Sequence, residues 1–157
     1  MKITAWRIVQ ARHLATAFDG KSAELNPGRW NRSGTPLIYT AGSLSLAALE
    51  ILVHVEILEI LRLYSCIPVS FDESLCKRLG ARVLPKNWSN DPIPASTRNL
   101  GSTWARKRES AVLAVPSAII PLEWNYLINP LHPDFEKIVI GSAARFRFDT
   151  RLLGFRE

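Results

Sequence analysis

Three residues in the first third of the chain have side chains that suit one kind of chemistry. Arg29 lies in the turn-rich block 28–31, Tyr39 lies in a short apolar run, and Glu50 interrupts an apolar segment. A guanidinium pairs with phosphate, an aromatic ring packs against a flat heterocycle, and a carboxylate stabilises a developing cation. Together these preferences describe a dinucleotide whose glycosidic bond is to be broken.

Two of the three residues also have simpler explanations when each is considered alone. Arg29 precedes Trp30, and an arginine can stack on a neighbouring tryptophan or form a surface ion pair. Tyr39 could fill the core and satisfy its hydroxyl group at the edge of a strand. For each residue taken by itself, the structural explanation is favoured over ligand binding.

Glu50 is harder to explain by structure alone. It lies within the almost wholly apolar segment 46–53, and a helix that is apolar on all sides is expected to be buried. A carboxylate in such a place must be paired, hydrogen-bonded or functional, because burial of a bare charge is strongly unfavourable. Function and structural pairing are equally good explanations, and His54, one helical turn further on, is a candidate partner.

Three polar residues of the second half could complete a cleft around Glu50. Ser117 follows the apolar run 111–116, and Asn125 and Asn129 flank a short apolar segment. No Gly-x-Ser-x-Gly motif surrounds Ser117, so a hydrolase nucleophile is not indicated and a turn serine is the simpler explanation. The two asparagines either donate hydrogen bonds to a ligand or shape their turns.

The expected elements alternate between short strands and helices. Strands are predicted at 4–9, 37–40, 61–69, 111–115, 125–128 and 138–140, with 146–148 closing the sheet, and helices at 43–56, 71–79 and 97–109. The proline-rich segment 81–96 predicts a long surface excursion that could form a lid. This order favours an α+β fold in one domain spanning 1–157, with mixed, short-stranded sheets and flanking helices.

Composition narrows the function classes. The chain has 157 residues, of which 47% are hydrophobic, so it is expected to bury a core. Neither a signal peptide nor a membrane span is predicted, because the longest apolar stretch, 44–61, contains four ionisable groups. Cys66 and Cys76 match no zinc or redox spacing, which favours reduced thiols and a cytoplasmic location. No phosphate loop, Rossmann fingerprint or metal motif is present, so we expect a site without metal or cofactor.

The net charge of +6 leaves three kinds of partner open: an anionic small molecule, an acidic protein or a nucleic acid. The basic residues are spread from Arg7 to Arg156 and cluster only loosely. Because a dispersed excess is most often a solvated surface, nucleic-acid binding is the least favoured of the three.

Six motifs follow one another along most of the chain, and each is weak by itself. They are Trp6-Arg7-Ile8; Gly28-Arg29-Trp30-Asn31 with Gly34 and Pro36; Ile38-Tyr39-Thr40; Ser45-Leu46-Ala47-Ala48-Leu49-Glu50 with Val53-His54; Val115-Pro116-Ser117-Ala118; and Asn125-Tyr126-Leu127-Ile128-Asn129-Pro130 with His132-Pro133. In this order and at these spacings they resemble the RES domain, a family named after an arginine, a glutamate and a serine. The core of the resemblance covers about residues 4–140.

The resemblance implies a toxin of a bacterial toxin–antitoxin pair with a fold similar to that of ADP-ribosyltransferase toxins. Such toxins deplete NAD by hydrolysis or phosphorolysis of the nicotinamide–ribose bond, so NAD is the substrate and inorganic phosphate a candidate co-substrate. The implied partner is an Xre-type antitoxin that blocks the active site and carries a helix-turn-helix. DNA would therefore be contacted only through the antitoxin, and a higher-order toxin–antitoxin oligomer is compatible with this picture.

Carried over residue by residue, the family's name-giving residues fall on Arg29, Glu50 and Ser117 as the catalytic set. Tyr39 is similar to the cleft tyrosine of the family, and Arg7 is a second candidate for the arginine.

Asn125 and Asn129 complete the expected substrate-binding set. Two other functions remain as alternatives to NAD depletion: mono-ADP-ribosyl transfer to a macromolecule, and non-catalytic binding of nucleic acid by a basic module.

Overall fold

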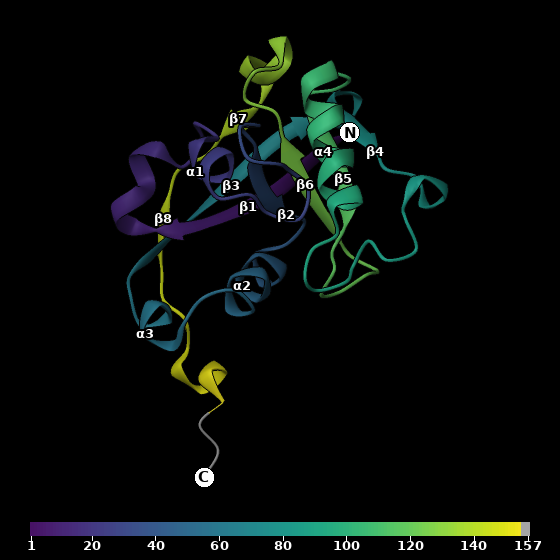
Figure 1. Cartoon of the computed structure of the whole chain (residues 1–157). Coiled ribbons are helices and arrows are strands. Elements are labelled where there is room, and N and C mark those ends of the chain that lie inside the picture. Colours follow the sequence, from purple (N-terminus) through teal and green to yellow (C-terminus); the bar gives the residue numbers. More distant parts are fainter. Residues whose placement is uncertain (155–157) are drawn as a thin grey trace.

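The computed structural model describes residues 1–154 and contains one mixed sheet flanked by helices (Figure 1). The strands are β1 (Lys2–Gln10), β2 (Ile38–Ala41), β3 (Tyr64–Asp72), β4 (Cys76–Arg78), β5 (Val112–Pro116), β6 (Trp124–Ile128), β7 (Val139–Ile140) and β8 (Ala144–Phe146). They are ordered β4-β5-β6-β2-β1-β3-β7, with β8 also paired to β3. All pairs are antiparallel except β4 with β5. The predicted α+β class is confirmed.

The sheet is closely paired on both sides of one weak junction. β1 and β3 pair along their whole length, from Lys2 opposite Asp72 to Gln10 opposite Tyr64. β1 and β2, by contrast, are joined only through Trp6 opposite Ala41. The two halves of the sheet therefore separate between β1 and β2, and this separation leaves room for a cavity.

The helices lie on different sides of this sheet. They are η1 (Ala11–Thr16), α1 (Lys21–Leu25), α2 (Leu44–Leu52), α3 (Ile57–Ile60), η2 (Glu73–Leu75), η3 (Ala81–Val83), α4 (Ala95–Lys107), η4 (Pro133–Lys137) and η5 (Thr150–Leu153), where η marks a 3-10 helix. Figure 1 shows α4 beside β5, and α2 and α3 together near the C-terminal segment. No helix within residues 1–154 has the length and apolarity needed to cross a bilayer.

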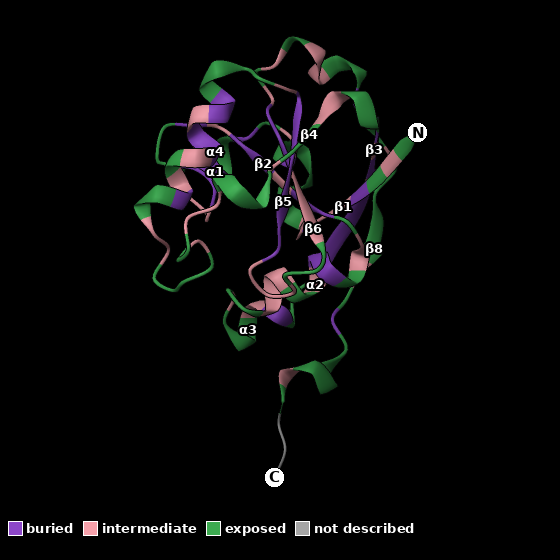
Figure 2. Cartoon of the chain, turned by 90° about the vertical axis from the view of Figure 1, so that its right-hand side faces the viewer, coloured by how far each residue is buried: buried purple, intermediate pink, exposed green. Residues whose placement is uncertain are grey.

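Buried residues follow the strands and the inner side of α4 (Figure 2). They form three clusters, around Phe71 and Ile128, around Leu46 and Tyr64, and around Trp104. Every residue of β5 is buried, as expected for a central strand that is covered on both faces.

Two expected helices differ from the structure. The helix that Ser43 caps ends at Leu52, since the amides of Val53 and His54 close the final turn. The helix expected at 71–79 is wrong: β3 continues to Asp72 because its last residues pair with the start of β1, and η2 and β4 follow. Pairing with a distant strand outweighed the local pattern.

The expectation that α2 would be apolar and buried on all sides is also wrong. Only Leu46 and Ala47 of this helix are buried, whereas Leu49 and the following Val53 are exposed. Glu50 lies between these two surfaces and is partly accessible, so it is available to a ligand.

Candidate active site

A cavity of about 650 Å³ lies where β1 and β2 separate, and its size is typical of small-molecule sites. Its walls come from β1, β2, α2, the block before Trp30 and the excursion after Trp88. The polar side chains that line it include Arg7, Arg29, Tyr39, Glu50, His54, Asp91 and Asn125. Five of the seven predicted site residues therefore line one cavity.

Glu50 accepts two hydrogen bonds on the same carboxylate oxygen. Ser117 Oγ donates to Glu50 Oε1 at 2.8 Å, and Asn125 Nδ2 donates to the same atom at 2.7 Å. Within residues 1–154, no donor contacts Glu50 Oε2. One oxygen thus fixes the orientation of the carboxylate and the other remains available to a ligand.

Ser117 is fully buried at the end of β5 and does not itself line the cavity. Its hydroxyl group accepts hydrogen bonds from the amides of Ile119 and Ile120, both at 3.1 Å, and donates its proton to Glu50. With its proton and both lone pairs engaged, this hydroxyl group positions the carboxylate and is not free to act as a nucleophile.

Asn125 has a fixed orientation because Glu50 can only accept hydrogen bonds when it is ionised. The amide nitrogen must therefore face Glu50, and the amide oxygen must face away. That oxygen is buried and has no donor among the described residues. An unsatisfied buried acceptor beside a cavity is typical of a site that a ligand or water completes.

The block 28–31 holds Tyr39 by a network of hydrogen bonds. The Tyr39 hydroxyl group donates to Asn31 Oδ1 at 2.6 Å and accepts from the amide of Trp30 at 3.0 Å. Asn31 Oδ1 also accepts from the amide of Gly28 at 2.9 Å. A Cβ atom on Gly28 would lie 2.7 Å from the Tyr39 hydroxyl oxygen, so glycine is required for this close approach.

The Tyr39 phenol stays neutral. Burial of its hydroxyl group raises the pKa of that group above the ordinary value through desolvation. The ring of Tyr39 forms part of the cavity wall.

Arg29 lines the cavity and also binds the excursion that faces it. Its Nη1 atom donates to the carbonyl oxygens of Trp88 and Asn90, each at 2.9 Å. The rings of Trp30 and Trp88 stack with centroids 5.9 Å apart. Burial lowers the pKa of Arg29, while the nearby carboxylates of Asp91 and Glu50 oppose that shift.

Arg7 is the second cation of the cavity. Its Nε donates to the Ala17 carbonyl at 2.7 Å and its Nη1 to the Tyr39 carbonyl at 3.0 Å, across the gap between β1 and β2. Burial lowers the pKa of Arg7 to about 10, so the group stays charged at neutral pH. No carboxylate of the described chain forms an ion pair with it. Arg7 is half-buried, and its guanidinium also lies 6.0 Å from the centroid of the Phe18 ring. A cation whose hydrogen-bond partners are only carbonyl groups is suited to receive an anion.

The structure places Asn129 outside this site. Its amide donates to the Ala105 carbonyl at 2.9 Å and its side-chain oxygen accepts from the Leu131 amide at 3.0 Å, in a buried position. It therefore fixes the turn after β6, and its prediction as a substrate-binding residue is not supported. His54 lines the cavity but forms no hydrogen bond to Glu50 among the described contacts.

Sequence reasoning missed Asp91 and the positioning role of Asn31. The composition of the excursion 81–96 pointed to a functional loop, but no pattern in it singled out Asp91. Asn31 belongs to the motif at 28–31, but its hydrogen bond from the Tyr39 hydroxyl group becomes evident only in the folded loop.

Comparisons with known proteins agree with the resemblance. The RES domain family matches residues 4–149. A protein named Toxin Res from Yersinia enterocolitica is 38% identical over 148 residues, which cover 94% of this chain and 97% of that protein. A Prs ADP-ribosylating toxin from Sphingobium sp. is 36% identical over 159 residues and covers 98% of both chains.

The fold is also similar to a solved structure. A chain in the crystal structure of the M. tuberculosis MbcT-MbcA toxin-antitoxin complex superposes with a TM-score of 0.76 at 14% identity, covering 94% of this chain and 85% of that one. The fold, the family match over most of the length and the relatedness to proteins named as toxins agree, and the chain belongs to the RES domain family.

Proposed function

We propose that this chain is the toxin of a toxin–antitoxin pair and that it consumes NAD by cleaving the bond between nicotinamide and ribose. The observation that carries the proposal is the carboxylate of Glu50, which is oriented through one oxygen and open at the other. It shares a cavity with two arginines and the ring of Tyr39. These groups match the ribose, the pyrophosphate and the heterocycle of a dinucleotide.

The two arginines supply the positive charge that a pyrophosphate needs. Arg29 and Arg7 both line the cavity. In each guanidinium, some N–H groups donate hydrogen bonds to backbone carbonyl oxygens. Because a guanidinium carries five N–H donors in a planar fork, both retain donors for phosphate oxygens. Their carbonyl contacts hold the charges in place before substrate arrives, which reduces the cost of ordering them.

The reaction can be written with the groups at hand. The C1′–N bond breaks, its electron pair neutralises the pyridinium ring, and nicotinamide leaves uncharged. Positive charge develops at C1′ of the ribose, where Glu50 Oε2 stabilises it. Water then adds to C1′ and loses a proton, which gives ADP-ribose, or phosphate adds and gives a phosphorylated ADP-ribose. Because the pyridinium ring of the substrate is already cationic and departs as neutral nicotinamide, neither a general acid nor a further cofactor is required.

Ser117 and Asn125 act through Glu50. Their hydrogen bonds to one carboxylate oxygen aim the other oxygen at the cavity. The buried oxygen of Asn125 is an acceptor for a substrate N–H or O–H group.

The test is direct. The purified chain is incubated with NAD, with and without inorganic phosphate, and the products are identified by mass. We expect free nicotinamide together with ADP-ribose or a phosphorylated ADP-ribose. Intact NAD under conditions where the chain is folded would contradict the proposal.

The second candidate function is transfer of ADP-ribose to a macromolecule, and it is favoured by the name of the Sphingobium relative. The same bond breaks, but the acceptor is a side chain or a nucleic acid. Radiolabelled NAD that marks a protein or a nucleic acid, with no free ADP-ribose, would favour this function.

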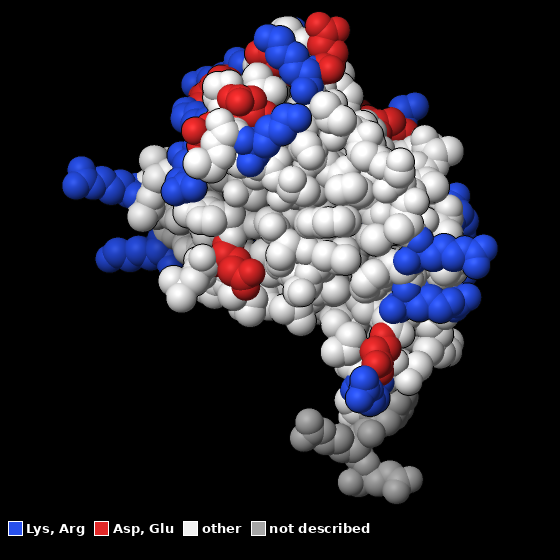
Figure 3. Space-filling view, turned by 180° about the vertical axis from the view of Figure 1, so that it is seen from behind, with Lys and Arg blue, Asp and Glu red and all other residues white. Residues whose placement is uncertain are grey.

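The face drawn in Figure 3 gives no support to a basic nucleic-acid-binding module. Figure 3 shows one face with basic side chains at its margins and a broad uncharged surface between them. Such an arrangement does not form the continuous stripe that follows a phosphate backbone.

The proposed partner is an Xre-type helix-turn-helix antitoxin, through which the pair would contact DNA. The toxin-antitoxin complex with a similar fold supports an antitoxin as the partner, and the Xre type is proposed from the family resemblance. We expect the antitoxin to present a carboxylate or another anionic group to Arg29. A complex that leaves the cavity open would contradict this expectation.

A further inference from the structure

Asp91 is an acidic side chain of the cavity wall that the reaction above leaves without a role. It lines the cavity and is exposed, and it forms no ion pair or side-chain hydrogen bond with the described part of the chain. A solvated carboxylate that faces a site for an anionic substrate is unfavourable unless it contacts a donor of that substrate. Its position therefore calls for an explanation.

The backbone next to Asp91 is held in place. The carbonyl of the preceding residue, Asn90, accepts a hydrogen bond from Arg29, and the carbonyl of Trp88 accepts another. The Trp88 carbonyl also accepts from Thr97 Oγ1 at 3.3 Å, which ties the excursion to the start of α4. Asp91 is thus fixed close to Arg29, and its carboxylate lies near enough to act on the charge of that guanidinium.

The two carboxylates of the cavity belong to different walls. Glu50 comes from α2, and Asp91 comes from the excursion that precedes α4. The carboxylates of Asp91 and Glu50 both oppose the lowering of the Arg29 pKa by burial. If Arg29 binds the pyrophosphate, a carboxylate is available to each of the two sugars that the pyrophosphate connects.

We propose that Asp91 accepts hydrogen bonds from the 2′- and 3′-hydroxyl groups of the adenosine ribose and thereby makes the cavity selective for NAD over its 2′-phosphorylated form. A carboxylate is an acceptor-only group with two oxygens, which matches a pair of vicinal hydroxyl donors. Acidic side chains select an unphosphorylated ribose in the same way in other dinucleotide sites. A 2′-phosphate would place a second anion against Asp91. This inference rests on the proposed NAD-consuming function.

The main experiment compares NAD with NADP as substrates. Nicotinamide release is measured for the unmodified chain, for Asp91→Asn and for Asp91→Ala. We expect the unmodified chain to prefer NAD by at least about tenfold in kcat/KM. Asp91→Asn keeps the size of the side chain but removes the charge. It should raise KM for NAD, leave kcat nearly unchanged because the adenosine end is remote from the breaking bond, and shift the preference toward NADP by about tenfold or more.

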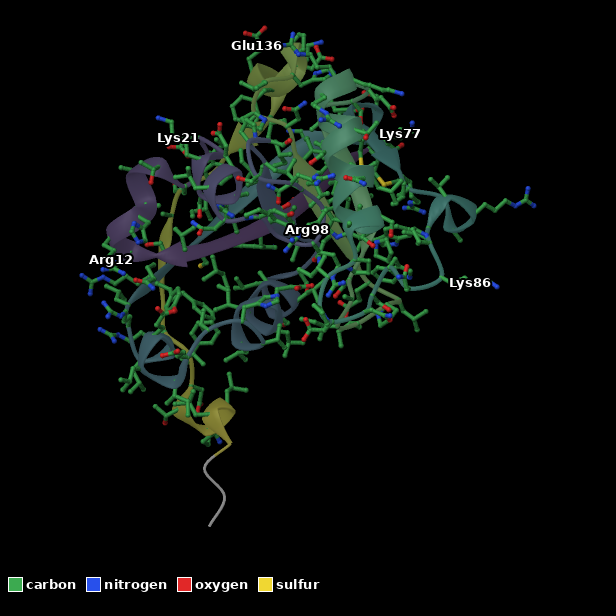
Figure 4. The ribbon with its side chains drawn as sticks, in the orientation of Figure 1. Arg12, Lys21, Lys77, Lys86, Arg98 and Glu136 are labelled. Carbon is green, nitrogen blue, oxygen red and sulfur yellow. The ribbon has the colours of Figure 1, made fainter. Side chains whose placement is uncertain are left out.

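A charge-matched control separates a local effect from a change in overall charge. Glu136 lies in η4, far from the cavity and at the edge of the molecule (Figure 4), and Glu136→Gln removes one negative charge just as Asp91→Asn does. We expect the control to leave both substrates unaffected. An equal shift in the control, an equal fall for both substrates in Asp91→Asn, or no preference in the unmodified chain would each overturn the role of Asp91.

A binding measurement keeps this inference apart from the proposed reaction. Titration calorimetry with ADP-ribose and with its 2′-phosphorylated form requires no bond cleavage. A preference for ADP-ribose that Asp91→Asn abolishes supports the role of Asp91 even if turnover is absent, and absent turnover then contradicts the reaction alone. Equal affinity for the two ligands in the unmodified chain contradicts the role of Asp91 whether or not NAD is cleaved.

Discussion

The carboxylate of Glu50 receives its two donors from residues that are distant in the sequence. Ser117 lies 67 positions away and Asn125 lies 75 positions away, on β5 and β6 or their ends. Both side chains bind the same oxygen, so the carboxylate is held in one orientation while its other oxygen faces no protein donor among residues 1–154. At the scale of residues, the site consists of one oriented carboxylate that shares a cavity with two arginines, each of which donates only part of its N–H groups to the protein.

Glu50→Gln tests whether the negative charge, and not merely the shape of this side chain, supports the reaction. Glutamine can still accept hydrogen bonds from Ser117 and Asn125, so we expect the thermal midpoint to change by no more than about 3 °C. Nicotinamide release should fall by about two orders of magnitude, the usual effect of removing one stabilising group from a transition state.

Glu56→Gln is the matched control, because Glu56 is exposed near the end of α2 and does not line the cavity. It should retain full turnover. If Glu50→Gln also retained full turnover, Glu50 would have no part in the mechanism.

At the scale of elements, the excursion between η3 and α4 is a wall of the cavity and is attached at one side to the loop that carries Arg29. Two hydrogen bonds from Arg29 and the stacking of Trp30 on Trp88 form this attachment. The predicted surface excursion is therefore tied across the site, and the loop and the excursion depend on each other.

Replacement of Arg29 by alanine should loosen the excursion. Each lost hydrogen bond contributes roughly 1 kcal/mol, so local opening should become about tenfold more frequent or more. Hydrogen exchange of the amides in 86–93, followed by mass spectrometry, measures this change.

The control for this prediction is Arg32→Ala, which removes an exposed hydrogen bond to Asn99 on α4 and none to the excursion. It should leave exchange in 86–93 unchanged. Equal exchange in the Arg29 variant and the unmodified chain would show that Arg29 does not hold the excursion.

Gly101→Ala tests how α4 packs on the loop that carries Arg29. A Cβ atom at Gly101 would overlap the carbonyl group of Trp30, which is backbone and cannot rotate away. Alanine is favoured over glycine in a helix by about 1 kcal/mol, but a forced shift of packed backbone costs more, about 1 to 3 kcal/mol. We expect a lower free energy of unfolding, measured in urea.

Gly80→Ala is the control, since a Cβ atom at Gly80 would meet nothing within 4 Å. This variant should be neutral or slightly more stable, because alanine restricts the unfolded chain. Stabilisation by Gly101→Ala would mean that α4 does not contact the loop as described.

At the scale of the whole molecule, one sheet connects three buried clusters. Tyr126, Tyr64 and Tyr39 each pack in or against a different cluster, and the chain contains no other tyrosine. Burial raises the pKa of all three hydroxyl groups. The three phenols therefore report on the three clusters separately.

Alkaline titration should show whether the clusters unfold together. Below the ordinary tyrosine pKa of about 10, both the native and the unfolded chain keep the phenolic proton, and stability does not depend on these groups. Above it, only the unfolded chain ionises readily, so stability falls as pH rises. We expect tyrosinate absorbance to appear in one step that coincides with the loss of the circular dichroism signal.

The unfolded chain in denaturant provides the reference, and its three phenols should titrate near about pH 10. Tyr126→Phe should remove one of the three contributions to the absorbance step and leave its midpoint nearly unchanged. Separate steps for separate tyrosines would show that the clusters unfold independently.

Much of the fold follows from local patterns. The strands predicted at 4–9 and 111–115 are found as β1 and β5, and the second was recognisable as an apolar run of strand length. The helix predicted at 43–56 begins where expected, with Ser43 accepting a hydrogen bond from the amide of Leu46. The segment 71–79 was misassigned, since pairing of β3 with β1 decided its conformation.

The sequence by itself determined which residues are chemically unusual. An acidic residue in an apolar segment, an arginine between turn signals and a proline-rich excursion are local features, and their chemistry is set by composition and spacing. These features, with the order of the six motifs, identified the family without the structure.

Only the tertiary structure decided how these residues combine. In the folded chain, Glu50 accepts hydrogen bonds from Ser117 and Asn125, and none from the nearby His54 among the described contacts. Asn129 lies in a buried turn outside the site, and Asp91 lines the cavity. The physical reason is that contacts between distant segments depend on strand order and on the separation of β1 from β2, and neither is encoded in the spacing of neighbouring residues.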